Sequence, residues 1–482
     1  MSPPTRSVAL LALTTALAAC TTVGPQFERP PAPSANSYAA PGDTAPARAA
    51  LSPEARQAGV WWAALGSADL DRLIREALKD SPTLAEADAV LARNRAQAEA
   101  AAGRLKPQAD VSAGAKRERI NTAVFGISNF PSPTVSFYTV GGTVAYDLDL
   151  FGGGRRRVEE AGALVEAQAR RADAAYLALT GEIAMQAVTI AYLRGEIAAV
   201  QATIEDDREL NRAISDAIKA GGEAPPALAT GAAQLADDEA DLPPLLRALD
   251  VARHRLALLA GKAPAGWAPP DFELATFTLP GQIPVSLPSD LVRRRPDILA
   301  AEADLHAAVA DIGVQTAALY PNIRLSASLT QSALSPEDLF GYSASGWDIG
   351  GGLTAPLLHG GTLHANKRAA EAQARAAMAR YQQTVLVAFN QVADALQALA
   401  RDEEAIAARQ GSEAANAENV RLAEAAYRLG GGPLFRVIDA RRDLARARRD
   451  RVRAEGQRLA DVISLYAATA GGWTDEQRAA VR

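Results

Sequence analysis

The sequence predicts a mainly helical chain that also supplies part of a membrane β-barrel, and it predicts that two copies of one unit make up the chain. The duplication is directly visible, because residues 82–113 align without a gap on residues 296–327, including the two prolines of each copy. Long helices are predicted by apolar residues that recur every seven positions. Strands are predicted by short segments in which apolar and polar residues alternate.

Residues 1–19 have the pattern of a signal peptide. Arg6 precedes an apolar stretch, residues 8–17, which is too short to span a bilayer. The following Leu17-Ala18-Ala19-Cys20 resembles a bacterial lipobox, which implies cleavage before Cys20, a lipid on this cysteine and sorting to the outer membrane. An ordinary signal peptide that happens to contain a cysteine is the alternative. Cys20 is the only cysteine, so an internal disulfide is impossible.

Residues 20–59 are expected to form a lipidated N-terminus and an extended tether. The segment is rich in proline, alanine and glycine, and it has too little apolar surface to offset the entropy of ordering. A lipid on Cys20 would hold the protein to a bilayer without spanning it.

The first copy, residues 60–285, is predicted to run helix, strand, strand, helix. Helical order is expected from Trp61 and Trp62, and a long helix follows the strands. Its heptad seam consists of Ile183, Ile190, Ile197 and Ile204. A later leucine series, Leu228 to Leu256, contains Pro243 and Pro244. These prolines are predicted to divide that helix into two coaxial pieces, because proline removes a backbone donor and clashes with the preceding turn.

The second copy, residues 286–473, is predicted to repeat this order, and residues 474–482 form a C-terminal tail. Its long helix carries a matching seam of apolar residues at Val385, Val392, Leu399 and Ile406. The four predicted strands cover about residues 108–117, 134–148, 322–331 and 345–357.

Four strands per chain leave open sheet edges, which a membrane does not tolerate. A barrel would therefore have to be closed by several chains. Two chains would give eight strands with an interior filled by side chains, and three would give twelve strands and room for a lumen. The alternative is a small soluble sheet on a coiled-coil stalk, which alternation by itself does not exclude.

Motifs along nearly the whole mature chain resemble the TolC-like outer membrane efflux family, in its NodT-type lipoprotein branch. They are Leu17–Cys20 with Val23-Gly24-Pro25, Trp61-Trp62, Leu291–Ile298 with Glu302, Tyr320-Pro321-Asn322, Tyr427–Gly430, Val437–Arg441, and Leu465-Tyr466 before Gly471–Trp473. The resemblance implies a homotrimer with a twelve-stranded outer membrane barrel and a long α-helical barrel that extends into the periplasm. It also implies an exit duct that docks a periplasmic adaptor and an inner membrane pump of the resistance-nodulation-division type.

Catalytic and cofactor-binding motifs are missing from the sequence. The histidines do not have metal-ligand spacing, and the glycine-rich segment from Gly152 to Arg157 lacks the end of a phosphate loop, so it is interpreted as a strand-to-helix turn. The balance of 50 basic and 56 acidic residues argues against nucleic acid as a partner. We therefore expect no enzyme, no metal and no cofactor other than a lipid on Cys20, and passive transport.

The resemblance implies that two turns between long helices, at the periplasmic tip, contact the adaptor. They contain Gly221, Gly222 and Glu223 in the first copy, and Gly430, Gly431, Gly432 and Pro433 in the second. Glycine ends a helix and proline begins the next, so ordinary helix punctuation explains these residues as well.

The resemblance also places a periplasmic gate just after the second turn. Asp439 matches an acidic gate position of the family, whereas Arg436 stands where some members have a second acid. Arg436 or Arg441 could neutralise Asp439 within one chain or between chains. Tyr427 and Arg428 are further candidates for links that lock the closed state. A solvated helix face is the alternative. The competing function is a structural coiled-coil outer membrane lipoprotein without a pore.

Overall fold

The computed structural model describes residues 22–31, 37–43, 49–51, 60–121, 132–281, 283–285 and 288–469. Residues 1–19, Cys20, the motif Gly471–Trp473 and the tail 474–482 lie outside these ranges. The chain divides into two compact units. The first contains residues 1–30, 90–168 and 300–381, and the second contains residues 31–89, 169–299 and 382–482.

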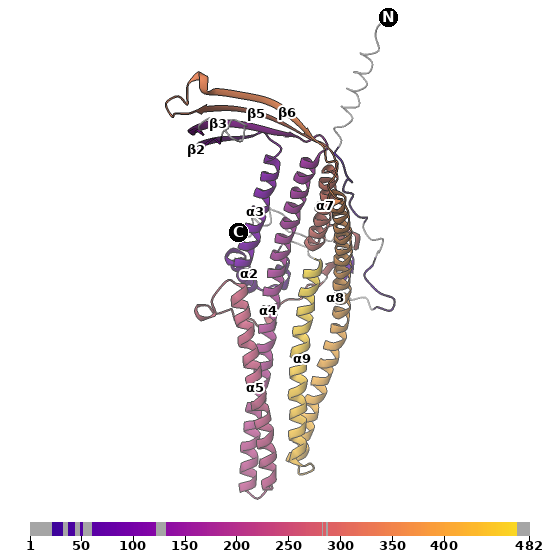
Figure 1. The fold of residues 1–482 in the computed structure, drawn as a ribbon. Coiled ribbons are helices and arrows are strands. Elements are labelled where there is room, and N and C mark those ends of the chain that lie inside the picture. The colour runs from indigo at the N-terminus through magenta and orange to yellow at the C-terminus, as the bar shows by residue number, and fades with distance from the viewer. Residues whose placement is uncertain are drawn as a thin grey trace. The chain divides into compact units, whose positions relative to one another are not determined.

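Helices form most of the described chain (Figure 1). They are α2 (Ala68–Asp80), α3 (Pro82–Gly103), α4 (Gly153–Lys219), α5 (Pro225–Leu259), α6 (Pro288–Val292), α7 (Pro296–Ala317), α8 (Thr362–Arg428) and α9 (Leu434–Thr469), with short 3-10 turns at Trp61–Leu65, Pro264–Gly266, Leu274–Thr276 and Tyr342–Ala344. The strands are β1 (Ala49–Leu51), β2 (Gln108–Arg119), β3 (Thr134–Leu148), β4 (Ile283–Val285), β5 (Asn322–Ala333) and β6 (Ser345–Thr354).

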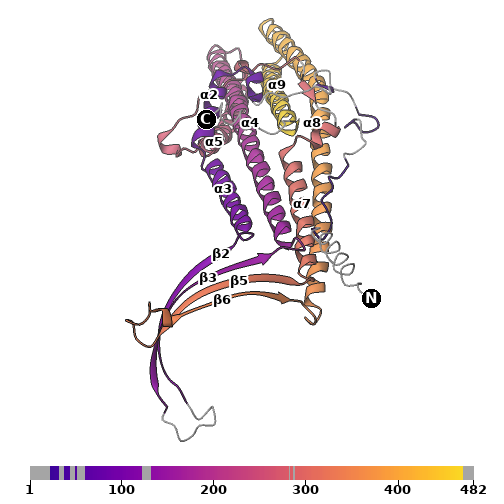
Figure 2. The same ribbon diagram turned by 90° about the horizontal axis from the view of Figure 1, so that it is seen from above.

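The four longer strands form one antiparallel sheet in the order β2-β3-β5-β6, and Figure 2 shows them side by side in a curved layer. β3 has the predicted bounds, β2 and β5 extend two residues further, and β6 ends three residues earlier. Because neighbouring strands alternate in direction, β2 and β6 run in opposite directions at the two open edges. The β6 edge of one chain can therefore pair antiparallel with the β2 edge of another.

The strand register collects the alternating residues of all four strands onto two chemically different faces. Val111 lies opposite Gly142, Tyr146 opposite Leu325, and Ala327 opposite Ile349, so one face is apolar across the sheet. These apolar side chains are exposed, at 84% for Val111 and 78% for Ile349. A broad exposed apolar face with a polar opposite face is the pattern of a membrane barrel wall.

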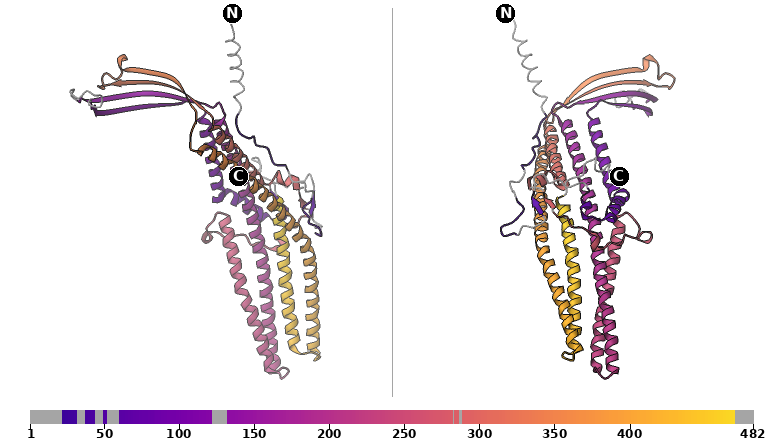
Figure 3. Two further views of the ribbon diagram at one scale, coloured as in Figure 1. Left: turned by 45° about the vertical axis from the view of Figure 1, so that its right-hand side comes forward. Right: turned by 180° about the vertical axis from the view of Figure 1, so that it is seen from behind.

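Two helical hairpins belong to the second unit, where α5 lies beside the later part of α4 and α9 beside the later part of α8 (Figure 3). α4 and α8 each contain 67 residues, which corresponds to roughly 100 Å at about 1.5 Å per residue. The predicted seams are buried, since Ile183, Ile190, Val392 and Leu399 are at most 4% exposed. The heptad prediction is confirmed for these helices.

The predicted break at Pro243 and Pro244 is wrong, because α5 is one continuous helix through both prolines. The prolines cannot donate to the carbonyls of Glu239 and Ala240, but all four residues are exposed, so water can satisfy these carbonyls. The leucine series is also only partly internal. Leu249 and Leu256 are buried, whereas Leu228 is 36% exposed.

Residues that carried the sequence resemblance pack the core of the second unit. Trp62 is fully buried, and the Trp61 ring stacks on Tyr466 with centroids 5.6 Å apart. Arg295, at the start of α7, is also buried. It donates to the Ala468 carbonyl of α9 at 3.0 Å and to Gln391 of α8 at 2.8 Å. The arginine-rich motif before α7 therefore ties together three helices of this unit.

Several residues in the described parts of the expected tether have specific partners elsewhere in the chain. The Val23 N–H donates to the Phe151 carbonyl at 3.1 Å, Phe27 stacks on His306, and Tyr38 is 8% exposed against Phe389. The sequence predicts an extended tether here because its average composition is poor in apolar residues. That average conceals single aromatic side chains and backbone groups that have specific partners.

Candidate functional site

The two hairpin turns have the same backbone geometry. Gly221 and Gly430 adopt positive φ angles of 78° and 71°. One residue later, the N–H of Gly222 donates to Ala217 at 2.8 Å, and that of Gly431 donates to Ala426 at 2.9 Å. These are the bonds of a helix that ends in a left-handed residue, a conformation that favours glycine. The predicted turn residues are therefore explained as helix ends, while a role in docking has to be argued separately.

An apolar cluster lies just before and after these turns and joins both hairpins. Its buried members are Ile214 of α4 and Leu434, Val437 and Ile438 of α9, all at most 6% exposed. Partly buried residues from α4, α5 and α8 pack around it, namely Leu210, Ile218, Ala227, Ala423 and Tyr427. The cluster holds the turn-proximal ends of all four helices against one another.

Tyr427 is the predicted gate residue that reaches across to the first hairpin. Its ring packs on the apolar cluster, and its phenol lies beside Glu223 of the first turn. Burial, together with the hydrogen bond to Glu223, raises the pKa of Tyr427. The phenol therefore stays protonated near neutral pH, and its O–H can donate to the Glu223 carboxylate.

The other predicted gate residues remain on their own hairpin. Arg428 donates Nε to the Glu424 carbonyl one turn earlier, at 3.4 Å, and Arg436 is exposed. Asp439 is also exposed and pairs with Arg442 of the same helix at 3.5 Å. Within the chain, Asp439 therefore pairs with Arg442 and not with Arg436 or Arg441. That one of these two arginines neutralises Asp439 of another chain stays a prediction.

Arg441 instead forms the polar link between hairpins that the sequence did not reveal. Its Nη2 and Nε donate to Glu424 Oε1 of α8 at 2.5 and 3.0 Å. Its Nη1 donates to the Asp206 carbonyl of α4 at 3.3 Å. The side chains of Arg441 and Glu424 are 28% and 33% exposed, so water screens this pair only in part. One side chain of α9 thus connects α8 with the first hairpin.

Beside this link lies a pair of buried carboxyl groups, Asp207 of α4 and Asp238 of α5. They are 6% and 7% exposed, and Gln234 donates to Asp238 Oδ2 at 2.8 Å. Burial and then the neighbouring Asp238 raise the pKa of Asp207 to about 7, against the opposing charge of Arg441. The pair therefore holds a proton at pH values where an exposed aspartate is ionised.

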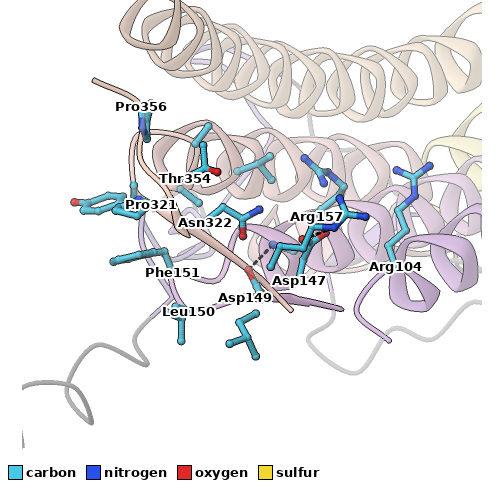
Figure 4. A pocket seen from close by; sticks show the side chains of 18 of the residues that line it. Arg104, Asp147, Asp149, Leu150, Phe151, Arg157, Pro321, Asn322, Thr354 and Pro356 are labelled. Carbon is cyan, nitrogen blue, oxygen red and sulfur yellow. Dashed lines mark hydrogen bonds and ion pairs between the residues drawn. The ribbon is translucent and has the colours of Figure 1, made fainter. Parts of the chain in front are cut away.

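In the first unit, the strands join the helices around a cavity of about 800 Å³ (Figure 4). Arg104, Arg157 and Arg324 line it together with Asp147 and Asp149. Asp149 caps α4, because it accepts from the N–H groups of Gly154 and Arg155 at 2.8 Å each, and Asp147 lies 4.0 Å from Arg324. Figure 4 shows Arg104 and Arg157 toward one end of the cavity and Pro356 toward the other. The cavity borders the polar face of the sheet and carries more guanidinium than carboxylate groups.

The glycine-rich segment before α4 is confirmed as a strand-to-helix turn, with Gly152 at a φ of 76° between β3 and α4. In the described ranges, no three His, Cys, Asp or Glu side chains are placed to hold a metal ion.

The site near the two hairpin turns consists of links that can break and re-form. They are the Tyr427–Glu223 contact, the bonds of Arg441 to Glu424 and Asp206, and the proton between Asp207 and Asp238.

Comparison with known proteins gives a consistent result. A family model described as outer membrane efflux protein matches residues 73–262 and 287–471. The chain is 32% identical over 486 residues to outer membrane protein OprJ of Pseudomonas aeruginosa, covering 100% of this chain and 98% of that protein. It is 30% identical over 337 residues to nodulation protein T of Rhizobium leguminosarum bv. viciae, covering 70% of each. The solved outer-membrane channel OprN has a TM-score of 0.84 and 26% identity, over 94% of this chain and 100% of that one.

Proposed function

The chain belongs to the outer membrane efflux protein family and is the outer membrane channel of a tripartite efflux system, and we propose that the links between its two helical hairpins form the gate of that channel. The channel is a trimer in the outer membrane that reaches into the periplasm and works with an adaptor and a pump. The resemblance inferred from the sequence motifs is thereby confirmed. The competing prediction, a structural coiled-coil lipoprotein without a pore, does not fit a family of efflux channels.

The contact of Arg441 with both Glu424 and the Asp206 carbonyl carries the gate proposal. Moving the second hairpin away from the first breaks the bond to Asp206, separates Tyr427 from Glu223 and opens the apolar cluster between Ile214 and α9. A hydrogen bond to a charged group stabilises by about 1.5–3 kcal/mol. A few such bonds are enough to keep the gate closed and few enough for a docked partner to open it.

In the proposed gate, Asp439 and Arg436 are the residues that face the opening. Both are exposed at the start of α9, and Arg442 neutralises Asp439 only through a 3.5 Å contact. Three copies of Asp439 in a trimer would give a ring of negative charge that attracts cations.

Single-channel recording in planar bilayers tests the gate. Arg441→Ala and Tyr427→Phe are each expected to raise the open probability, about tenfold if 1.4 kcal/mol of closed-state stability is lost. Arg421→Ala is the matched control, because Arg421 pairs with Glu418 on its own helix and is exposed. Asp439→Ala should lower the preference for cations. Equal open probability in Arg441→Ala, Arg421→Ala and the wild type would contradict the gate.

We further propose that Cys20 carries a covalent lipid that anchors the channel to the outer membrane. The support is the lipobox-like sequence, since Cys20 lies outside the described residues. Mass spectrometry of the purified protein should find acyl chains on Cys20 and none in Cys20→Ala. A wild-type N-terminal peptide without acyl mass would refute the anchor.

Members of this family are transport channels rather than enzymes, and we propose that this chain catalyses no reaction and passes cargo without an energy source of its own. We propose a partner pump of the resistance-nodulation-division type and a periplasmic adaptor that touches the turn residues from Gly221 to Glu223 and from Gly430 to Pro433. A cysteine at Leu429, which is 87% exposed, should cross-link to the adaptor in cells, and one at Leu422, 52% exposed, should not. Equal cross-linking at both positions would argue against contact at the turn.

A further inference from the structure

The segment that directly follows the proposed lipid site, residues 22–29, is held by side-chain and backbone contacts to other parts of the first unit. We call this segment the strap, and we call the residues of the β3–α4 turn, α4 and α7 that contact it the groove. Arg156, in the first turn of α4, donates Nε to the Val23 carbonyl at 3.2 Å and Nη2 to the Gly24 carbonyl at 3.3 Å. The Val23 N–H donates to the Phe151 carbonyl at 3.1 Å. The Arg156 side chain is only 4% exposed, so its charge is buried against the strap.

We infer that this site fixes the position of the lipid anchor, with Arg156 as the positioning residue that holds the strap beside the end of β3. The inference rests on the proposed lipidation of Cys20. Its subject is different, however: it concerns where the lipid-bearing end is held and by which side chain.

Glycines make the contact between strap and groove unusually close. Gly24 has a φ of 91°, and a Cβ on it would lie 2.5 Å from the Gly313 Cα of α7. A Cβ on Gly313 would lie 2.7 Å from the Arg156 side chain, and one on Gly152 would lie 2.7 Å from Thr22. A larger residue at Gly24 or Gly152 would push the strap away from the first unit, and one at Gly313 would displace the Arg156 side chain that holds the strap. The glycine of the Val23-Gly24-Pro25 motif therefore packs closely against a specific residue, Gly313 of α7.

The second half of the strap is held through the same acid that pairs with Arg156. Phe27 stacks on the His306 ring of α7 at 4.4 Å, and His306 Nε2 lies 3.0 Å from Glu159 Oε1. The other oxygen of Glu159 accepts from Arg156 Nη1 at 2.8 Å. Glu159 thus connects both halves of the groove. One further bond closes the strap, from Arg29 Nε to Glu302 Oε1 at 2.6 Å.

The position of the groove determines what the strap does. β3 ends at Leu148, and the strap meets the chain at Phe151, only three residues later. Cys20 precedes Thr22 by two residues, which limits its reach from Thr22 to about 7 Å at ~3.3–3.6 Å per residue. Acyl chains on Cys20 therefore enter the bilayer next to the wall of the barrel. A free tether would set no such distance, so the strap couples the anchor rigidly to the barrel.

Limited proteolysis of the full-length trimer in detergent tests this inference. Glutamyl endopeptidase can cut after Glu28, which is exposed within the strap, but a bound strap must first detach to fit the protease. Arg156→Ala removes the two hydrogen bonds to the strap carbonyls and should speed this cut about tenfold or more, as expected for bonds to a charged group. Arg156→Lys should show an intermediate rate. The neighbouring Arg157→Ala, which lines the cavity and not the groove, should be cut at the wild-type rate.

Gly24→Ala provides the second variant, because it changes the strap and leaves the buried residues of the groove untouched. It should be cut as fast as Arg156→Ala while the trimer remains intact. Wild-type rates for both variants would overturn the inference. The mass of the released peptide, residues 20–28, reports lipidation independently. If both variants release an acylated peptide at the wild-type rate, the strap is refuted. If the wild type releases the peptide more slowly than the variants but without acyl mass, only the lipid on Cys20 is refuted.

Discussion

α5 and α9 occupy the same place in the two copies of the unit and have nearly the same length, 35 and 36 residues, but they pack differently. α5 buries six of its residues, whereas α9 buries fifteen. α5 contains three arginines and α9 contains nine. Arginines of α9 pair with acids on three other helices: Arg453 with Glu196 of α4, Arg449 with Asp241 of α5, and Arg451 with Glu413 of α8.

The comparison teaches that duplication preserved the lengths of the elements while the packing roles diverged. A helix that buries few of its residues can tolerate prolines and exposed leucines, and α5 has both. A helix that contacts three neighbours needs an unbroken backbone and long side chains that reach outward in several directions. α9 fits that description, and it also carries Arg441, the link between the hairpins.

The largest effect is expected when the proline of one helix is moved into the other. Pro243 is the nineteenth residue of α5, and Val452 is the nineteenth residue of α9. Val452→Pro removes a hydrogen bond within α9 and disturbs packing against Gly195 of α4, and proline alone costs about 3 kcal/mol or more. We expect no stable trimer on size-exclusion chromatography. A normal trimer would show that α9 is no more central than α5.

Each hairpin contains one pair of aspartates with a raised pKa, so the pH dependence of stability can be compared between the two hairpins. Burial and Asp238 raise the pKa of Asp207 to about 7, and burial and Asp461 raise the pKa of Asp402 in the second hairpin to about 7. The folded state therefore holds protons that the unfolded chain releases near pH 4. Their stabilisation is fully present below pH 4 and is lost as the pH rises through 7, by on the order of 4 kcal/mol for each pair.

The thermal midpoint of the trimer, measured between pH 4 and 8, should fall as the pH rises. Asp207→Asn and Asp402→Asn should each flatten this slope by a similar amount, because asparagine does not ionise. A slope that responds to only one of the two substitutions would add a second difference between the hairpins. An unchanged slope in both would show that neither pair shares a proton.

A smaller effect is expected from single arginines. Arg453→Ala leaves Glu196, whose side chain is 2% exposed, without its bonds at 2.9 and 3.4 Å. An unpaired buried carboxylate costs about 2–3 kcal/mol. On α5, Arg255→Ala removes an exposed pair with Glu182 and should cost less than about 1 kcal/mol. Denaturant unfolding of both variants measures the difference, and equal losses would contradict the unequal roles of the two helices.

Helices and strands with a regular pattern of apolar residues could be predicted from the sequence, whereas contacts between single side chains of different helices could not. Alternation located β3 to the residue, and the isoleucine seam from Ile183 to Ile204 located the buried face of α4. By contrast, Arg441 and Glu424 lie on different helices that a turn separates, and α8 and α9 offer many other acids and arginines. Which of them meet depends on how the two helices are rotated, and no pattern in the sequence records that rotation.

The strap and the carboxyl pair were missed for different reasons. The strap was hidden by averaging, because a segment rich in proline and alanine is expected to be free, although Val23, Gly24 and Phe27 each have a partner. Asp207 was not singled out in the sequence, because an aspartate on a long helix is rarely buried. Its burial depends on Asp238 of the neighbouring helix, which can share its proton.

The smallest expected effect concerns the prolines of α5 themselves. Pro243→Ala restores the N–H that can donate to Glu239 and relieves a helix-interior penalty of about 3 kcal/mol. It also frees the unfolded chain, which costs about 0.4–1 kcal/mol, and it displaces water that already hydrates the exposed Glu239 carbonyl. We therefore expect a net gain of about 1 kcal/mol in the free energy of unfolding, measured with denaturant. A loss of stability would mean that the prolines give α5 a bend that its neighbours require, and α5 would then be as constrained as α9, for a reason of shape rather than charge.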